Sequence, residues 1–174
     1  LQPVIAIVVP CYNESAVLSM SMAKLSEVLG AMVEDGTVSS QSYILCVNDG
    51  STDSTWEEIE KFHRRDTRIK GISLAHNRGH QYALLAGLMT VKDRCDAAVS
   101  IDADLQDDPD IIPEMVKLFI AGNEIVYGVR KSRATDSWFK RTTARAFYTM
   151  QRRLGVDTVY DHADYRLMSR RALE

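Results

Sequence analysis

Short, continuously apolar segments alternate along the chain with longer segments whose apolar residues recur at helical spacing. Consecutive apolar residues are typical of strands that helices cover on both faces, so the short segments predict β-strands. These strands are expected at residues 4–9, 43–48, 69–75, 97–101 and 124–129. The intervening segments predict helices at residues 15–34, 53–66, 79–92 and 110–121. Asp53 and Asp110 are the expected caps of the second and fourth helices.

This strand–helix alternation predicts an α/β fold with a mainly parallel sheet and helices on both faces. In such sheets, ligands bind beyond the carboxyl ends of the strands. Every predicted strand is followed by a polar segment, and we expect these segments to form one site. In chain order they are PCYNES, DGSTDS, HNRGHQ, DADLQDDP and RKSR.

Composition and charge refine this picture. The 174 residues make one domain of ordinary size, and a hydrophobic fraction of 45% is enough to build a core. The net charge of −3 is unevenly distributed. Residues 131–153 hold seven Lys or Arg and one acid, a net of +6, so the rest of the chain carries −9, the difference between −3 and +6. The asymmetry indicates an anionic partner on one side and a cation site elsewhere.

The cysteines and the ends of the chain carry less information. Cys11, Cys46 and Cys95 lack the spacing of metal ligands and lie in or beside apolar strands, so we expect buried thiols in a reducing compartment. We identify no signal peptide and no apolar stretch of about 20 residues, and expect no membrane span in the chain. Because the chain stops within a helix-like stretch, it is expected to be part of a longer protein.

The first three polar segments suggest nucleotide recognition, and each also has a plainer interpretation. Tyr12 could stack on a base and Glu14 could accept a hydrogen bond from a ribose, or both could simply begin a helix. Asp49 could accept from the imide N–H of uracil or N1–H of guanine, or could belong to an ordinary strand–turn–helix junction. Arg78 and His80 could meet a phosphate at a helix start, or could face solvent.

The fourth polar segment is acidic. Asp102 and Asp104 are separated by one residue, which on an extended strand end would place both carboxylates on one side, close enough to share a divalent ion. Oxygen ligands without Cys or His favour Mg²⁺ or Mn²⁺ over Zn²⁺. The aspartates within residues 107–110 are explained as a turn and a helix cap.

Together these motifs resemble the family 2 glycosyltransferases. PCYNE, NDGSTD, NRGHQYALLAGL and DADLQDDP occur in the family's order over essentially the whole chain. YGVRKSR and DYRLMSR resemble a narrower group, the polyprenyl-phosphate sugar synthases, which includes dolichyl-phosphate mannose synthase and bactoprenol glucosyltransferase. The resemblance implies a GT-A fold, Mg²⁺ or Mn²⁺, and inverting transfer of a hexose from a UDP- or GDP-sugar to a polyprenyl phosphate.

The resemblance also implies roles for individual residues. Those expected to bind the nucleotide are Pro10, Tyr12, Glu14, Asp49 and Asp102. Those expected to hold the metal and flank the sugar diphosphate are Asp102, Asp104 and Gln106. The catalytic residues are expected to be Asp104, Asp164 and Arg166. Those expected to bind the acceptor phosphate are Arg130, Lys140, Arg141 and Arg166.

The acceptor side is expected to be basic. A phosphate acceptor is already largely anionic near neutral pH, its second pKa being about 6, so Asp164 would orient it or take a residual proton. Residues 137–154 can form an amphipathic helix, which would either pack on the core or lie on an anionic membrane surface. Residues 1–130 would then form the nucleotide-sugar core, and 131–174 a membrane-proximal segment of the same domain.

This interpretation places the domain at the cytoplasmic face of a membrane, peripherally or through an anchor outside the chain. A nucleic-acid partner is not expected, because no reading module accompanies the basic segment. Two alternatives stay open. The acceptor could be a growing saccharide, as in the synthesis of a cell-surface polysaccharide. The chain could also be a non-catalytic nucleotide-sugar-binding subunit, which would bind nucleotide without turnover.

Overall fold

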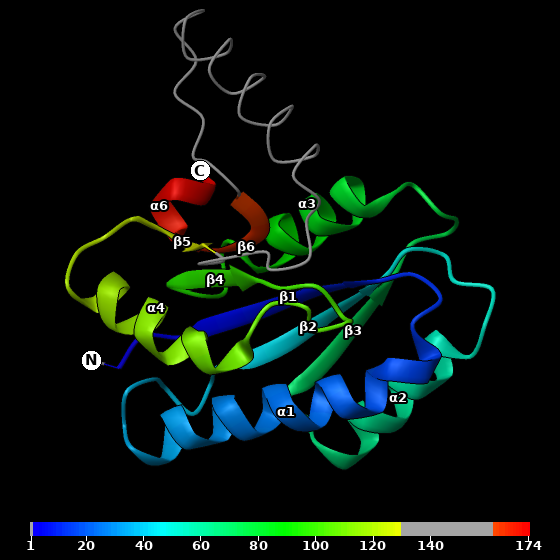
Figure 1. The fold of residues 1–174 in the computed structure, drawn as a ribbon, viewed down its shortest axis with the longest axis horizontal. Coiled ribbons are helices and arrows are strands. Elements are labelled where there is room, and N and C mark those ends of the chain that lie inside the picture. The colour runs from blue at the N-terminus through cyan, green and yellow to red at the C-terminus, as the bar shows by residue number, and fades with distance from the viewer. Residues whose placement is uncertain (1, 130–161) are drawn as a thin grey trace, which may run out of the picture.

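A computed structural model describes residues 2–129 and 162–174, which build a six-stranded sheet in the order β3-β2-β1-β4-β6-β5 (Figure 1). Strands β1 to β4 pair in parallel, whereas β6 is antiparallel to both β4 and β5. The strands are β1 (Ile5–Cys11), β2 (Tyr43–Asn48), β3 (Ile69–Ser73), β4 (Ala97–Ser100), β5 (Ile125–Val129) and β6 (His162–Ser169).

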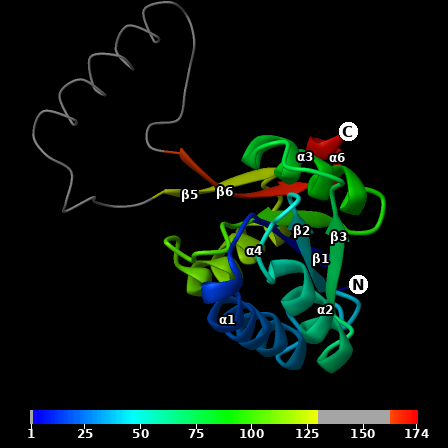
Figure 2. The ribbon, with the colours of Figure 1, turned by 90° about the vertical axis from the view of Figure 1, so that its right-hand side faces the viewer.

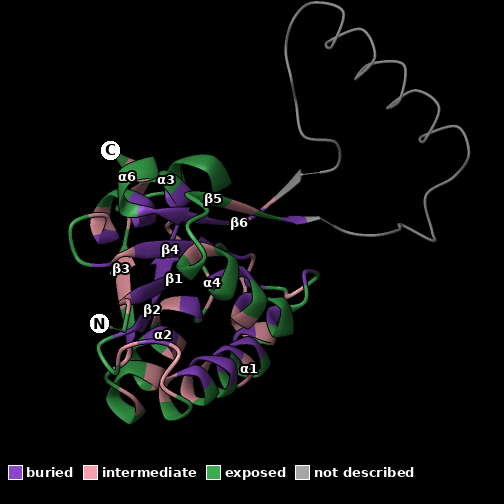
Figure 3. Ribbon diagram, turned by 90° about the vertical axis from the view of Figure 1, so that its left-hand side faces the viewer, coloured by how far each residue is buried: buried purple, intermediate pink, exposed green. Residues whose placement is uncertain are grey.

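Helices cover both faces of the sheet, as predicted. On one face lie α1 (Ser15–Glu34), α2 (Thr55–Arg65) and α4 (Ile112–Ile120), and on the other lie α3 (His80–Val91) and the short α6 (Arg170–Leu173) (Figures 1 and 2). All seven residues of β1 are buried. Ile5 and Ile7 belong to the core on the side of α1, α2 and α4, and Ala6 and Val8 belong to the core on the side of α3. Burial on both faces explains why the strand is continuously apolar, and Figure 3 shows the buried sheet between more exposed helices.

The α1 helix is long and apolar enough to cross a membrane, which the sequence analysis did not identify. Among the described residues only this helix passes that test, with a mean hydropathy of 1.4. Its buried side chains, including Leu18, Met22 and Leu25, lie in the core that α1 shares with the sheet. A helix that packs its apolar side chains into the core of a globular domain passes the same test of length and composition.

Two local predictions need correction. β6 was not expected. Its sequence HADYRLMS alternates polar and apolar residues, which is the pattern of a half-buried strand and differs from the continuously apolar segments of the predicted strands. Asp110 does not cap a helix. Asp108 instead accepts a hydrogen bond from the backbone N–H of Asp110 at 3.0 Å at the start of a 3-10 turn (Pro109–Ile111), and the Asp110 carboxylate pairs with Lys24 at 2.8 Å.

Other expectations are confirmed or lie outside the described residues. Cys11, Cys46 and Cys95 are all buried and unpaired. The basic segment 131–153, and with it the expected amphipathic helix, falls within residues 130–161, which are not described. Three of the residues expected to bind the acceptor phosphate also fall there, namely Arg130, Lys140 and Arg141. Their role and the division of the domain at residue 130 stay predictions.

Candidate active site

A pocket of about 340 Å³ lies where β1, β2 and β4 end and α3 begins. This is the edge of the sheet at which the sequence predicted a site. All five residues expected to bind the nucleotide line this pocket, and so does Asp104, whereas Gln106 and Arg166 do not. The chain segment before α3 adds Asn77 and Gly79, and the first residue of α3 adds His80.

Asp49 anchors the start of α3. It is buried, with 2% of its surface exposed, and its two carboxylate oxygens accept hydrogen bonds from the backbone N–H groups of Arg78 at 2.7 Å and Gly79 at 2.8 Å. These bonds fit the interpretation of Asp49 as part of a strand–turn–helix junction, because the carboxylate ties the end of β2 to the start of α3. An ionised carboxylate has lone pairs for about four hydrogen bonds, and these two bonds leave room for others. Contact between Asp49 and a base is therefore compatible with this geometry and stays a prediction.

Gly50 allows two loops of the site to approach closely. Its φ is +63°, a conformation that favours glycine, and a Cβ atom there would lie 2.5 Å from backbone atoms of His76 and Asn77. The turn after β2 therefore packs directly against the segment that leads into α3. A side chain at this position would push that segment away from Asp49.

The turns after β1 and β2 interlock and thereby hold Tyr12 and Glu14 at the pocket. The Oδ1 atom of Asn13 accepts from the Thr52 N–H at 2.9 Å, while Asp53 accepts from the backbone N–H groups of Ser15 at 3.2 Å and Thr55 at 3.0 Å. Desolvation opposes ionisation of Asp53, but the hydrogen bonds from Ser15 and Thr55 outweigh it and lower the pKa to about 2.

Acidic side chains give the pocket a strongly negative character. Burial raises the pKa of Glu14, and the negative charges of Asp104 and Asp102 raise it further. Burial also raises the pKa of Asp102; His80 opposes this effect, and the neighbouring carboxylates reinforce it. Like charges at this density favour binding of a cation, since a cation stabilises the ionised forms.

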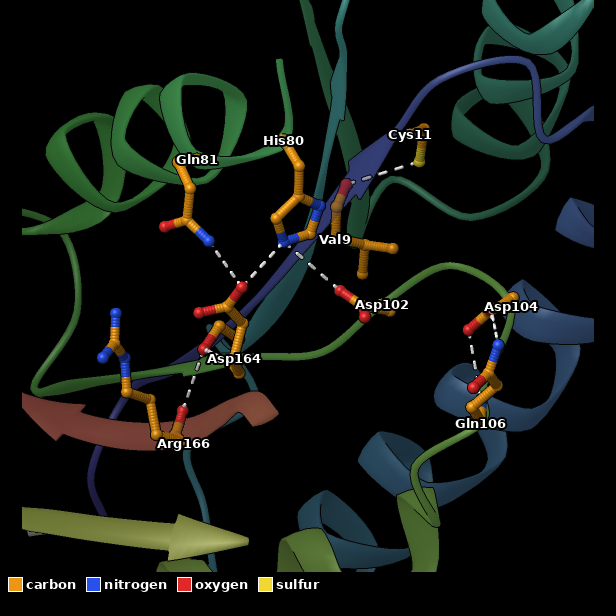
Figure 4. A network of polar contacts seen from close by, with 10 residues as sticks. Val9, Cys11, His80, Gln81, Asp102, Asp104, Gln106, Asp164 and Arg166 are labelled. Carbon is orange, nitrogen blue, oxygen red and sulfur yellow. Dashed lines mark hydrogen bonds and ion pairs between the residues drawn. The ribbon is translucent and has the colours of Figure 1, made fainter. Parts of the chain in front are cut away.

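His80 connects the acidic pocket with β6. Its Nε2 atom lies 3.6 Å from the Oδ1 atom of Asp102 and 3.1 Å from the Oδ2 atom of Asp164 (Figure 4). The same Oδ2 atom accepts a hydrogen bond from the Gln81 side chain at 2.6 Å. The first two residues of α3 thus hold Asp164 beside Asp102, although the two aspartates lie on different strand ends.

Pairing of β6 with β4 determines where Asp164 lies. Ser100, the last residue of β4, pairs with Arg166, and the Ser100 hydroxyl donates hydrogen bonds to the carbonyl oxygens of Asp164 and Arg166. Tyr165, between them, points to the opposite face and donates to the Asp108 carbonyl oxygen at 2.9 Å. β6 therefore brings DYRLMSR, the motif expected on the acceptor side, next to β4, the strand that the acidic segment DADLQDDP follows.

The acidic motif is not extended as the sequence analysis assumed. β4 ends at Ser100, the Leu105 N–H bonds to the Asp102 carbonyl oxygen at 3.2 Å, and Leu105 has a φ of +49°. Asp104 turns toward Gln106, whose backbone and side-chain N–H groups donate to it at 3.2 Å and 2.7 Å (Figure 4). The expected extended conformation was therefore wrong, although Asp102 and Asp104 line the same pocket.

The donor set still fits Mg²⁺ or Mn²⁺. The described ranges contain no group of three or more His, Cys, Asp and Glu side chains placed to hold an ion. Magnesium is usually held by one or two carboxylates, with substrate phosphates and water completing its coordination, so Asp102 and Asp104 are sufficient protein ligands. The assignment of the metal to Asp102, Asp104 and Gln106 stays a prediction.

Arg166 lies beside the pocket rather than in it. It lines a neighbouring groove with Gln81 and apolar residues of α3, and the stick view shows it rising from β6 on the same side as Asp164 (Figure 4). Gln81 was not predicted from the sequence, and the role of His80 was left open. Their position in HNRGHQ, directly after a predicted strand, was the available signal.

Comparison with known proteins identifies the family. The family model described as "Glycosyl transferase family 2" matches residues 6–174. An uncharacterised glycosyltransferase of Bacillus subtilis (strain 168) is 49% identical over 173 residues, covering 99% of this chain and 51% of the relative. The bactoprenol glucosyl transferase of Shigella phage SfV is 32% identical over 174 residues, covering 98% of this chain and 53% of the relative. The chain thus spans about half the length of the curated relatives it matches.

A solved structure supports the fold. The mannosyltransferase of Pyrobaculum calidifontis, in complex with GDP-Man and Mn²⁺, aligns with a TM-score of 0.59 at 19% identity, covering 98% of this chain and 46% of that one. At this identity the likeness concerns the fold, and it confirms the expected GT-A type. The family itself is shown by the match to the family model and by the sequence identity with the relatives. The chain belongs to glycosyl transferase family 2.

Proposed function

We propose that the protein is an inverting, metal-dependent glycosyltransferase that moves a hexose from a UDP- or GDP-sugar to a polyprenyl phosphate. The observation that best supports this function is the contact of His80 with both Asp102 and Asp164. Through it, the carboxylate expected on the donor side, which lines the pocket, and the carboxylate expected on the acceptor side lie beside one imidazole. Such convergence is what a transfer reaction between two bound substrates requires.

The donor would occupy the strand-end pocket. Tyr12, which is partly exposed, offers a face for the base, and the buried Asp49 and half-buried Glu14 offer acceptors for the base and ribose. Mg²⁺ or Mn²⁺ held by Asp102 and Asp104, with Gln106 beside them, would offset the negative charge that develops on the departing diphosphate. Relatives of this fold support such a donor, since the Pyrobaculum enzyme carries GDP-Man and Mn²⁺.

The transfer itself is a displacement at the anomeric carbon. An oxygen of the acceptor phosphate attacks from the face opposite the diphosphate, a new carbon–oxygen bond forms, and the bond to the nucleoside diphosphate breaks with inversion. The acceptor is already anionic, so it needs positioning more than deprotonation. Asp164, held by Gln81 at 2.6 Å, would orient the acceptor or take a residual proton, and Arg166 would bind its phosphate.

Similarity to a bactoprenol glucosyl transferase supports a lipid phosphate as the acceptor. DYRLMSR also supports it, since this motif contributes both Asp164 and Arg166 to one face of β6. With such an acceptor, the domain would work at the cytoplasmic face of a membrane. A saccharide acceptor and a non-catalytic nucleotide-sugar-binding subunit are the two competing functions, and each would give a different result in a transfer assay.

The test is a two-donor transfer assay. Radiolabelled UDP-glucose and GDP-mannose are each incubated with Mn²⁺ and a polyprenyl phosphate, and label entering the organic phase is counted. We expect transfer from one donor, loss of it with EDTA, and a large loss in Asp164→Asn but not in the control Asp93→Asn, at an exposed loop position. Label that stays aqueous with every donor, while calorimetry shows nucleotide binding, would refute the lipid acceptor.

A further inference from the structure

A groove of about 270 Å³ adjoins the active-site pocket between α3 and β6. It is lined by Gln81, Tyr82, Leu84, Leu85, Leu88 and Arg166. Gln81 links the groove to Asp164, since its side chain also donates a hydrogen bond to that carboxylate at 2.6 Å. The groove therefore lies beside the carboxylate expected on the acceptor side.

Arg166 provides the polar end of this groove. Its Nε atom is buried and, within residues 2–129 and 162–174, has no hydrogen-bond partner. A buried donor without a partner is costly, and native structures usually satisfy such groups. The Nε–H and a neighbouring Nη–H of a guanidinium form the fork that binds two oxygens of one phosphate. An anionic head group would satisfy the unpaired donor.

The α3 helix provides an apolar continuation. Tyr82, Leu85 and Met89, at helical spacing on one stripe, are 68%, 52% and 45% exposed. Large apolar side chains grouped on a surface mark an interaction site. The stripe starts one residue after Gln81, so it leads away from the point where Asp164 and Arg166 lie.

We propose that this groove binds the lipid part of the acceptor, with its phosphate at Arg166 and its first isoprene units along Tyr82, Leu85 and Met89. The inference rests on the proposed function and adds where the acceptor lies. An amphiphile with an anionic head and an apolar tail matches both ends of the groove. The volume is below the 300–1,000 Å³ typical of drug-sized pockets, so the groove accepts only the beginning of the chain and the rest stays outside it.

The test compares two acceptors of different tail length. Transfer from the active donor is measured to geranylgeranyl phosphate and to dimethylallyl phosphate, which has one isoprene unit. Leu85→Gln is expected to reduce kcat/KM for the longer acceptor about three- to tenfold, the order expected when the exposed half of a leucine loses apolar contact. The same variant should leave kcat/KM for the shorter acceptor and the affinity for the nucleotide unchanged. Arg166→Lys should reduce kcat/KM for both acceptors, because both carry the phosphate.

Leu118→Gln is the matched control, since Leu118 is 42% exposed on α4, which covers the opposite face of the sheet. A photoreactive benzophenone prenyl phosphate adds a readout independent of turnover, and should label the peptide that contains residues 82–89. Equal effects of Leu85→Gln and Leu118→Gln on an active wild type would overturn the groove assignment alone. A wild type that transfers to neither acceptor would overturn the proposed function and the groove together. A concentration-dependent dimer that Leu85→Gln dissociates would assign the stripe to a second copy instead.

Discussion

Replacing Gly50 with alanine tests how the site is assembled. Gly50 combines two constraints: its φ of +63°, and the 2.5 Å that would separate a Cβ atom from backbone atoms of His76 and Asn77. Gly122 shares only the first, since its φ is +103° and a Cβ there would meet nothing within 4 Å. The pair of variants Gly50→Ala and Gly122→Ala therefore separates the cost of the backbone conformation from the cost of the close approach.

The expected magnitudes follow from these two constraints. An alanine held at positive φ costs about 1–2 kcal/mol, which is the whole expected loss in Gly122→Ala. In Gly50→Ala the backbone of residues 76 and 77 must also move, and relief of such overlap costs about 1–3 kcal/mol more. The total of about 2–5 kcal/mol is a large part of the stability of an ordinary domain. The movement would also carry Arg78 and Gly79 away from Asp49.

Urea unfolding and nucleotide calorimetry measure both consequences. We expect Gly50→Ala to lower the free energy of unfolding more than Gly122→Ala does, and to weaken binding of the nucleotide, while Gly122→Ala keeps wild-type affinity. Equal destabilisation by the two variants would refute the close approach. Wild-type nucleotide affinity in a folded Gly50→Ala protein would refute the link between this turn and the pocket.

Three further perturbations test other parts of the molecule. Asp104→Asn should abolish the metal dependence of nucleotide binding and leave thermal unfolding unchanged, whereas unaltered affinity in calorimetry would remove Asp104 from the metal site. Asp53→Asn should cost about 1 kcal/mol at neutral pH, because the amide nitrogen that replaces one carboxylate oxygen cannot accept a hydrogen bond from Ser15 or Thr55. Because the folded pKa of about 2 lies below the ordinary 3.8, this stabilisation is complete above pH 3.8 and disappears as the pH falls through about 2, so urea unfolding should show the gap between the two proteins closing over that range. Gln81→Glu should reduce transfer at least tenfold by repelling Asp164 while nucleotide affinity is retained, and Gln81→Asn serves as a shorter amide for comparison; unchanged transfer in Gln81→Glu would exclude Gln81 as a positioning residue.

Local patterns in the sequence determined the element types and the location of the site. The continuously apolar run of β1 and the helically spaced core stripe of α1 each extend over neighbouring residues, so local patterns identified both. Motifs at the ends of β1, β2 and β4 had to meet, because parallel strands present their carboxyl ends at one edge of the sheet. Pro10, Asp49 and Asp102, which lie near the ends of three different strands, were found this way and do line one pocket.

Only the tertiary structure decided how the acceptor side joins that pocket. The place of β6 between β4 and β5 depends on pairing with strands far away in the chain, which also brings Asp164 to His80 and Gln81. The turn at Leu105, where Asp104 accepts a hydrogen bond from the Gln106 side chain, likewise departs from the extended geometry that spacing suggested. Periodicity reports the burial of neighbouring residues, whereas register and side-chain direction result from packing between segments, and that information is absent from any short stretch of sequence.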